Sequence, residues 1–340
     1  MTSTDAWDFH LPEDRIATRP AERREAARLL HLPLAGDGWV DGVVPDLLRH
    51  LRRGDLLVVN DTTVMAARLR AHRATGGAVE VLLLQPGPGE VEALIRPARR
   101  LKVGEVIEVA GAGTVTLVSK PDDEGIARVR TSPEPLELMA RAGELPLPPY
   151  LGRAADEQDT ERYQTVFGGP IGAAAAPTAG LHFTPELLAA LQAQGVELAR
   201  VTLHVGIGTF RPLRDEDIER GTLHAERYLI PPETAAAVAR TRAAGGRVIA
   251  VGTTSARALE SAASQDGALQ SGWAITRIFI SPPYRFRAVD GMLTNFHLPR
   301  SSLLMLVASL TGRERLLAAY AHAVQSGYRF YSYGDAMLLL

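Results

Sequence analysis

The 340-residue sequence contains no cysteine. This absence excludes disulfides, thiolate nucleophiles, Cys-ligated zinc and iron–sulfur clusters. It also excludes a disulfide-stapled secreted module, and any radical reaction that begins at a Cys-ligated cluster.

Lysine and long apolar runs are also scarce. Lys102 and Lys120 are the only lysines among 37 basic residues, so the remaining 35 are Arg. Such a skew is typical of a whole genome, so the Arg total is weak evidence for phosphate binding. The formal net charge is −2. The first ten residues lack the apolar core of a signal peptide, and the apolar run at 303–310 is far shorter than the ~20 residues of a membrane-spanning helix. We therefore expect a cytoplasmic protein that does not contact a membrane.

The composition is that of a folded chain, with 46% hydrophobic and 22% charged residues. At about 100–200 residues per domain, the length favours two domains. Residues 67–143 alternate between apolar and polar positions in short runs separated by Gly- and Pro-rich turns, which predicts a small antiparallel β-barrel. Residues 1–66 and 144–340 show a helix–strand rhythm. We predict an α/β main domain with a mixed sheet, built from both chain ends, and an inserted barrel at 67–143.

Local patterns predict individual elements of the main domain. Helices are expected at 21–30, 47–51, 232–244, 257–263, 301–311 and 313–326, and strands at 55–60, 196–205 and 247–251. Thr184 is a typical N-cap, with Pro185 at the first position of another helix.

The common catalytic motifs are missing. The sequence has no phosphate-binding P-loop, no complete dinucleotide fingerprint, no HExxH and no GxSxG. Four stretches instead combine small residues with polar ones. The first, at 177–183 (PTAGLHF), offers Thr178, Gly180 and His182 as a substrate loop. The alternative is a helix-entry turn with a packed histidine.

The second stretch, at 203–210 (LHVGIGTF), places His204, Gly206, Gly208 and Thr209 after an expected strand. Ligands of open α/β sheets bind at the carboxyl ends of strands, where glycines let backbone N–H groups approach an anion. A glycine-rich hairpin with a core histidine is the alternative.

The third stretch, at 251–261 (VGTTSARALES), leads from a strand into a helix. A helix N-terminus attracts carboxylates and phosphates, which favours a ligand site over a simple hydroxyl cap. The candidates are Gly252, Thr253, Thr254, Ser255 and Arg257.

The fourth stretch, at 294–299 (TNFHLP), offers Asn295 and His297 for a base edge; a turn before a buried helix is the alternative. In addition, His224 and Glu226 stand two residues apart in an extended segment and would point to the same face. A solvated pair is the alternative there. A metal site built from His182, His204, His224 and His297 is disfavoured because their spacing is non-local.

Nine stretches in order resemble the S-adenosylmethionine:tRNA ribosyltransferase-isomerase family of queuosine biosynthesis. They are FHLPEDRIA (9–17), GDLLVVNDTTVMAARL (54–69), LPLPPYL (145–151), RYQTVF (162–167), AAPTAGLHF (175–183), VTLHVGIGTF (201–210), VIAVGTTS (248–255), TNFHLP (294–299) and YRFYSYGDAM (328–337). The sequence departs from the family pattern at Thr63, Ala66 and 281–284.

The resemblance implies an α/β domain with an inserted barrel and a transferase that needs no metal or other cofactor. The reaction would move the ribosyl part of S-adenosylmethionine, a substrate, onto the aminomethyl group of 7-aminomethyl-7-deazaguanine at the tRNA wobble position. Epoxyqueuosine-tRNA, adenine and methionine would be the products. Our hypothesis is that His182, His204, His224 and Glu226 transfer protons, and that the glycine- and hydroxyl-bearing loops, Arg257, Asn295 and His297 bind substrates.

Transfer RNA would have to bind a local basic patch, because the net charge of −2 gives no overall attraction. One candidate contains Arg15, Arg19, Arg23, Arg24 and Arg28, and the other Arg96, Arg99, Arg100 and Lys102; solvated faces are the alternative. We expect a monomer. The competing functions are a non-catalytic tRNA- or nucleotide-binding protein and a metal-dependent hydrolase.

Overall fold

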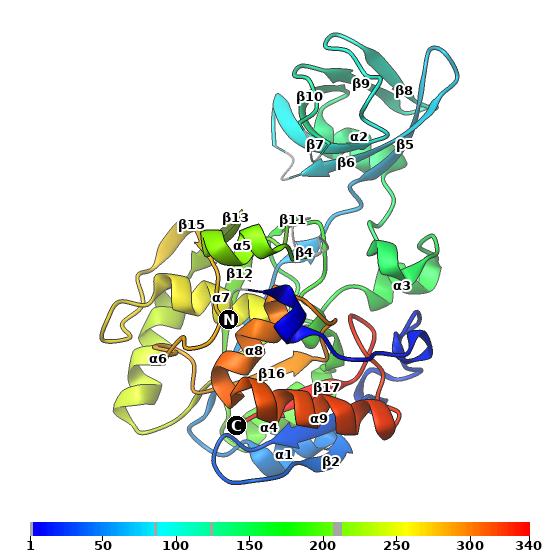
Figure 1. Ribbon diagram of the computed structural model, residues 1–340. Coiled ribbons are helices and arrows are strands. Elements are labelled where there is room, and N and C mark those ends of the chain that lie inside the picture. Colours follow the sequence, from blue (N-terminus) through cyan, green and yellow to red (C-terminus); the bar gives the residue numbers. More distant parts are fainter. Residues whose placement is uncertain (1–2, 85–86, 123–124, 207–212) are drawn as a thin grey trace. The chain divides into compact units, whose positions relative to one another are not determined.

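The computed structural model describes residues 3–84, 87–122, 125–206 and 213–340 (Figure 1). The chain divides into two compact units. The main unit contains Met1–Thr62, Arg162–Pro170 and Pro177–Leu340, and the barrel unit contains Thr63–Glu161 and Ile171–Ala176. Gly208 and Thr209 lie outside the described residues, so their predicted roles stay predictions.

The main unit is built on a mixed sheet. Its strand order is β15 (Gly272–Ile278), β13 (Thr222–Ile230), β12 (Glu197–Leu203), β3 (Leu56–Asn60), β14 (Val248–Val251), β16 (Gly291–Asn295), β17 (Ala336–Leu339), β1 (Arg28–Leu32) and β2 (Val40–Val43). The four central strands β12, β3, β14 and β16 are mutually parallel. Next to β12, β13 pairs antiparallel to β12, and β15 pairs antiparallel to β13. The carboxyl ends of these four strands therefore lie along the same edge of the sheet, the edge that runs across the strand ends.

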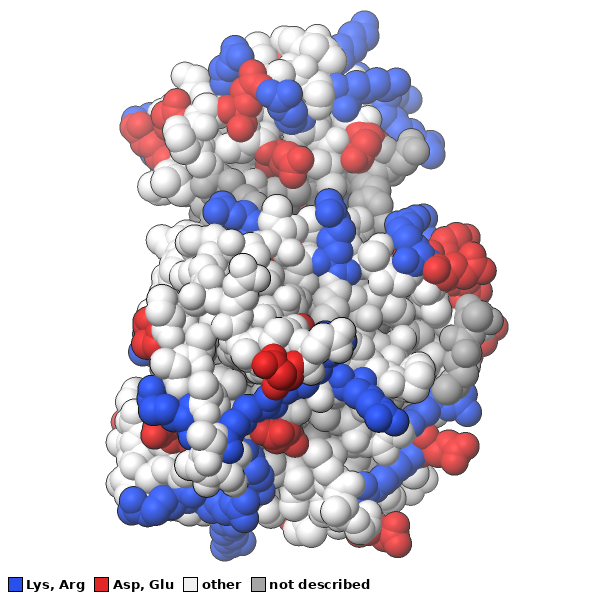
Figure 2. All heavy atoms as spheres, turned by 90° about the vertical axis from the view of Figure 1, so that its left-hand side faces the viewer, with Lys and Arg blue, Asp and Glu red and all other residues white. Residues whose placement is uncertain are grey.

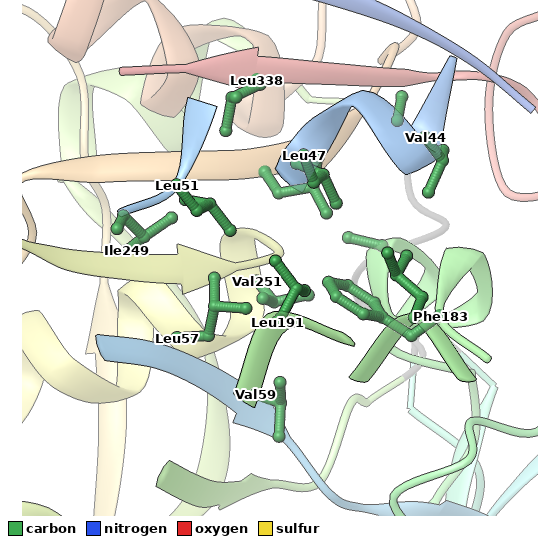
Figure 3. Close-up of a cluster of buried hydrophobic side chains, with 14 of the residues drawn as sticks. Val44, Leu47, Leu51, Leu57, Val59, Phe183, Leu191, Ile249, Val251 and Leu338 are labelled. Carbon is green, nitrogen blue, oxygen red and sulfur yellow. The ribbon is translucent and has the colours of Figure 1, made fainter. Parts of the chain in front are cut away.

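Helices cover both faces of this sheet because the central strands are apolar on both sides. Leu57 and Val59 of β3 face a core with α1 (Leu47–His50) and α4 (Pro185–Ala193), shown in Figure 3. Leu56 and Val58 point to the opposite face, which α7 (Thr253–Ala262) covers. The remaining helices are α5 (Asp215–Arg220), α6 (Pro232–Ala243), α8 (Ser302–Thr311) and α9 (Arg313–Gln325).

Most of the predicted main-unit elements are confirmed. Thr184 caps α4 by accepting a hydrogen bond from the backbone N–H of Leu187, and α8 is buried as expected. The prediction of a helix at 21–30 is wrong. Only a 3-10 turn forms at Arg24–Ala26, and Arg28–Leu32 is the strand β1. Its pairing with β17 and β2 outweighs the local helix preference of an Ala-, Arg- and Glu-rich segment.

The barrel unit contains the predicted antiparallel barrel, which closes in the order β10 (Ile126–Ser132), β7 (Glu90–Arg96), β6 (Ala78–Leu84), β5 (Arg68–Arg73), β8 (Val106–Val109) and β9 (Gly113–Leu117). Along β10, buried and exposed residues alternate strictly, as a small barrel with a filled interior requires. The unit also contains β4 (Thr63–Val64), β11 (Ile171–Ala173) and the helices α2 (Pro135–Ala142) and α3 (Glu157–Arg162). The domain boundaries at 67 and 143 stay a prediction.

Candidate active site

Candidate site residues lie at or just beyond the carboxyl ends of all four parallel strands. Thr62 follows β3, His204 follows β12, Gly252 follows β14, and Asn295 ends β16. This edge is where open α/β sheets bind their ligands. Three of the four predicted stretches meet there because their strands are parallel neighbours, a relation that no single stretch reveals.

His204 is held by the neighbouring strand end. Its Nδ1 lies 2.8 Å from Thr62 Oγ1, and its ring stacks on Trp273 with 5.6 Å between centroids. Asn60 fastens the two strand ends together, since its side chain bonds both the N–H and the carbonyl of Leu203. Burial and the nearby Arg227 charge lower the pKa of His204, so the ring is neutral at neutral pH and able to accept a proton.

Glu226 and Arg257 form a buried ion pair. Arg257 Nη1 lies 2.5 Å from Glu226 Oε2, and both side chains are 5% exposed. The other carboxylate oxygen accepts the Gly206 N–H at 2.9 Å. Among the described residues, Nε and Nη2 of Arg257 have no hydrogen-bond partner. Glu226 thus holds a buried guanidinium and the start of the loop after β12, and Arg257 keeps two donor nitrogens for another group.

His204 and Glu226, two of the residues predicted to transfer protons, point to opposite faces of the sheet. The His204 N–H bonds the carbonyl of Arg227, so His204 lies opposite Arg227, whereas the adjacent Glu226 points to the face that α7 covers. His224 is exposed, and the β13–β15 register shifts between residues 222 and 226. That irregularity breaks the expected alternation, so the His224–Glu226 pair does not share one environment.

Most polar groups at the start of α7 already form hydrogen bonds within the protein or are buried. Gly252 has φ +89°, which favours glycine, and its N–H donates to Leu293 O at 2.7 Å. Ser255 is fully buried and donates to Val251 O. Thr253 is also buried. Of these residues, Thr254 has a buried hydroxyl with no partner in the described part of the chain, so it is the side chain with capacity for a ligand.

His182 and Asn295 make a second polar group. Asn295 Nδ2 donates to Tyr331 O at 3.1 Å and lies 3.2 Å from His182 Nε2. Because the amide nitrogen can only donate, Nε2 accepts, and the proton of the neutral ring is on Nδ1. Burial, with the Arg329 and Arg24 charges, lowers the pKa of His182 to about 4. His182 is therefore a neutral hydrogen-bond donor through Nδ1.

The His297 side chain is buried and almost inaccessible to solvent. Its Nε2 lies 2.8 Å from Thr294 Oγ1, and its backbone N–H donates to the Tyr320 hydroxyl. Burial lowers the pKa of His297 to about 3, so the ring is neutral near neutral pH. These contacts favour a structural role over the predicted contact with a base.

The 177–183 stretch forms a 3-10 turn, Thr178–His182, before α4. A Cβ at Gly180 would lie 2.9 Å from Thr165 Cγ2 and 3.1 Å from the Phe167 ring. Gly180 is thus required for close packing, and Thr178 and His182 are the members of this turn with polar side chains.

Sequence reasoning missed several residues of these groups. Thr62 lies in the NDTT segment quoted above for its resemblance, directly after an apolar strand, which is the signal that would have found it. Trp273 carried no local signal, because only strand pairing brings β15 to His204. Arg162 and Arg329, which line the cavity beside His182, were also missed. So was Tyr331, whose carbonyl accepts a hydrogen bond from Asn295.

Several arginines of the first predicted basic cluster have partners within the protein. Arg23 pairs with Glu25, Arg28 with Asp41, and Arg24 donates to Leu181 O at 3.1 Å. Arg99 and Arg100 are exposed on the barrel unit. The face of the molecule in Figure 2 shows basic and acidic side chains interspersed.

Residues 3–84, 87–122, 125–206 and 213–340 include no group of three or more His, Cys, Asp or Glu side chains arranged to hold a metal ion. Within the same ranges, no helix has the length and apolar character needed to span a membrane.

Comparison with known proteins identifies the family. The queuosine biosynthesis protein family matches residues 4–339. The chain belongs to this family. A relative from Acidiphilium cryptum, named S-adenosylmethionine:tRNA ribosyltransferase-isomerase, is 53% identical over 98% of both chains. One of the same name from Gloeobacter violaceus is 53% identical over 99% of this chain and 96% of its own.

A solved structure supports the fold. The S-adenosylmethionine tRNA ribosyltransferase of Thermotoga maritima has a TM-score of 0.57 and 33% identity, covering 98% of this chain and 100% of its own. The family resemblance noted in the sequence is confirmed, as are the α/β fold with its barrel and the transferase class. The non-catalytic alternative is not favoured.

Proposed function

We propose that this protein is an S-adenosylmethionine:tRNA ribosyltransferase-isomerase of queuosine biosynthesis. It transfers and isomerises the ribosyl group of S-adenosylmethionine onto the aminomethyl group of 7-aminomethyl-7-deazaguanine in tRNA, releasing adenine and methionine. The observation that carries this proposal is the near-complete coverage of the chain by relatives of this name at about half identity. The polar edge of the parallel strands supplies a site of the right chemical kind.

The reaction needs three proton-related functions. The sulfonium charge acidifies the adjacent ribose carbon, so a base must remove a proton there; adenine must be held or protonated as it leaves; and the attacking amine must be neutral. His204 fits the base, since its ring is neutral and Thr62 fixes its orientation. His182 fits a hydrogen-bond donor that orients the bound substrate, because its neutral ring presents Nδ1–H.

Arg257 and Glu226 fit substrate binding rather than proton transfer. The donor nitrogens of Arg257 that lack a partner in the described structure match the carboxylate of S-adenosylmethionine. Glu226 positions Arg257 and the loop that begins at Gly206. Thr254, next to the helix start, completes the set of polar groups that we assign to this substrate.

We expect tRNA to bind local basic patches. We assign this binding to the cluster with Arg19, Arg23 and Arg24 and to the cluster with Arg99 and Arg100. Affinity should fall steeply with salt, because binding releases counterions from the phosphates. A flat salt response would contradict this assignment.

The direct test incubates the protein with S-adenosylmethionine and tRNA carrying 7-aminomethyl-7-deazaguanine, in the presence of a chelator. Adenine release and the mass of the tRNA nucleoside are followed together. We expect adenine to appear with a ribosyl-derived mass gain, without added metal. Tight tRNA binding with neither signal would overturn the enzyme assignment in favour of a binding module.

His204 and His224 give a matched pair for the residue roles. His204→Ala should lower turnover by about 100-fold or more, the usual contribution of a general base. His224→Ala, at an exposed position of the same sheet, should leave turnover within about threefold, well inside the effect of losing such a base. Equal losses in both variants, or full turnover in His204→Ala, would remove His204 as the base.

A further inference from the structure

A cavity with three arginines and no carboxylate opens beside His182. It is a small cavity that is open to solvent, and the described residues that line it include Arg24, Arg162, Arg329, Ser332 and His182. The arginines come from three distant parts of the chain, so the charge concentration is a product of the fold. Its lining therefore carries an excess of positive charge.

Arg162 is held by backbone carbonyl groups. Its Nη1 and Nη2 donate to the backbone carbonyls of Glu22 and Ala21 at 3.0 and 2.8 Å. Its Nε is buried and makes no hydrogen bond in the described part of the chain. These contacts fix the guanidinium in place. Glu25 forms its ion pair with Arg23 and is also close enough to interact with the Arg162 charge.

Arg329 forms a long ion pair with the buried Asp335. The carboxylate oxygens of Asp335 accept the backbone N–H groups of Arg28 and Arg329, at 3.0 and 2.8 Å. The Arg329 Nη2 lies 3.6 Å from the same carboxylate, beyond hydrogen-bonding distance. The short hydrogen bonds of Asp335 thus come from the backbone, and the Arg329 guanidinium faces Asp335 without a short hydrogen bond.

His182 adds an oriented donor. Asn295 occupies its Nε2, so the ring is neutral with its proton on Nδ1. A neutral donor beside two guanidinium groups is the combination that binds an oxyanion through both charge and geometry.

We propose that this cavity is an oxyanion site that holds an anionic group of a substrate. Resting on the proposed function, that group is a backbone phosphate of the tRNA, because the carboxylate of S-adenosylmethionine is assigned to Arg257. The arginine cluster at 19–28 borders the cavity through Arg24. The site orients the bound substrate next to His182 and the strand ends.

Inorganic phosphate tests the site without assuming any activity. Its binding to the whole protein is measured by calorimetric titration, with chloride at matched ionic strength as the reference. Arg162→Gln and Arg329→Gln should each weaken phosphate binding by about tenfold, as expected for loss of a charge-assisted contact. Arg162→Lys should keep part of the affinity, and Arg49→Gln, at an 80% exposed side chain, should keep all of it. Unchanged phosphate affinity in both Gln variants would overturn the proposal.

The enzyme assay identifies the source of the anion. We expect the Gln variants to raise the KM for tRNA by about tenfold and to leave the KM for S-adenosylmethionine unchanged. The reverse result would place the carboxylate of S-adenosylmethionine in this cavity and overturn its assignment to Arg257. Neither KM changing would overturn the substrate role. A wild-type protein without adenine release, but with phosphate binding that the Gln variants lose, would refute the proposed function and leave the oxyanion site intact.

Discussion

Glu226→Gln removes the negative charge that faces the buried Arg257. The amide oxygen still accepts the Gly206 N–H, so this change isolates the ion pair from the hydrogen bond. Breaking a buried pair from one side leaves an uncompensated charge and costs about 3–5 kcal/mol. We expect the free energy of unfolding to fall by that amount in urea, followed by circular dichroism.

A double-mutant cycle tests the physical reason. Arg257→Met alone leaves the Glu226 carboxylate buried without its cation, and should also be strongly destabilising. The double variant carries neither charge, so its loss should be smaller than the sum of the single losses by about 2–3 kcal/mol. Strict additivity would refute the claim that the two groups form one ion pair.

An exposed pair gives the matched control. Arg240 and Glu197 lie 3.6 Å apart, with side chains 65% and 59% exposed. Glu197→Gln should change the free energy of unfolding by less than ~1 kcal/mol, because solvent screens the pair. If Glu226→Gln costs no more than Glu197→Gln, burial of the Glu226–Arg257 pair does not determine its energy.

Two further predictions concern stability. The pKa values of His182 and His297 are lowered to about 4 and about 3, so the unfolded chain binds more protons between those values and about 6.5. The free energy of unfolding should therefore rise with pH through this window, and it should fall by about 2 kcal/mol when the pH is lowered from 6 to 5. His297→Gln should remove roughly half of this pH dependence, and an unchanged pH dependence would contradict the burial argument. Gly246→Ala should cost about 1–3 kcal/mol, because its Cβ would lie 2.1 Å from Gly54 O. Gly87→Ala, with open space around it, is the control, and equal melting temperatures for the two variants would contradict the clash.

The sequence by itself determined the elements whose signals are local. Alternation of apolar residues and Gly–Pro turns predicted the barrel, and the Thr184–Pro185 cap predicted α4. The ordered motifs predicted the family. The missing cysteines excluded whole classes of chemistry. Each of these signals lies within a few neighbouring residues, where backbone geometry and side-chain periodicity act directly.

Only the tertiary structure decided which residues meet. Strand pairing turned the helix-like segment at 21–30 into β1, and brought Trp273 and Thr62 to His204. It also turned Glu226 toward Arg257 and away from His204, and collected the three arginines beside His182. These contacts join residues far apart in the chain. Their energies depend on burial and on charges from other elements, and no local pattern in the sequence encodes them.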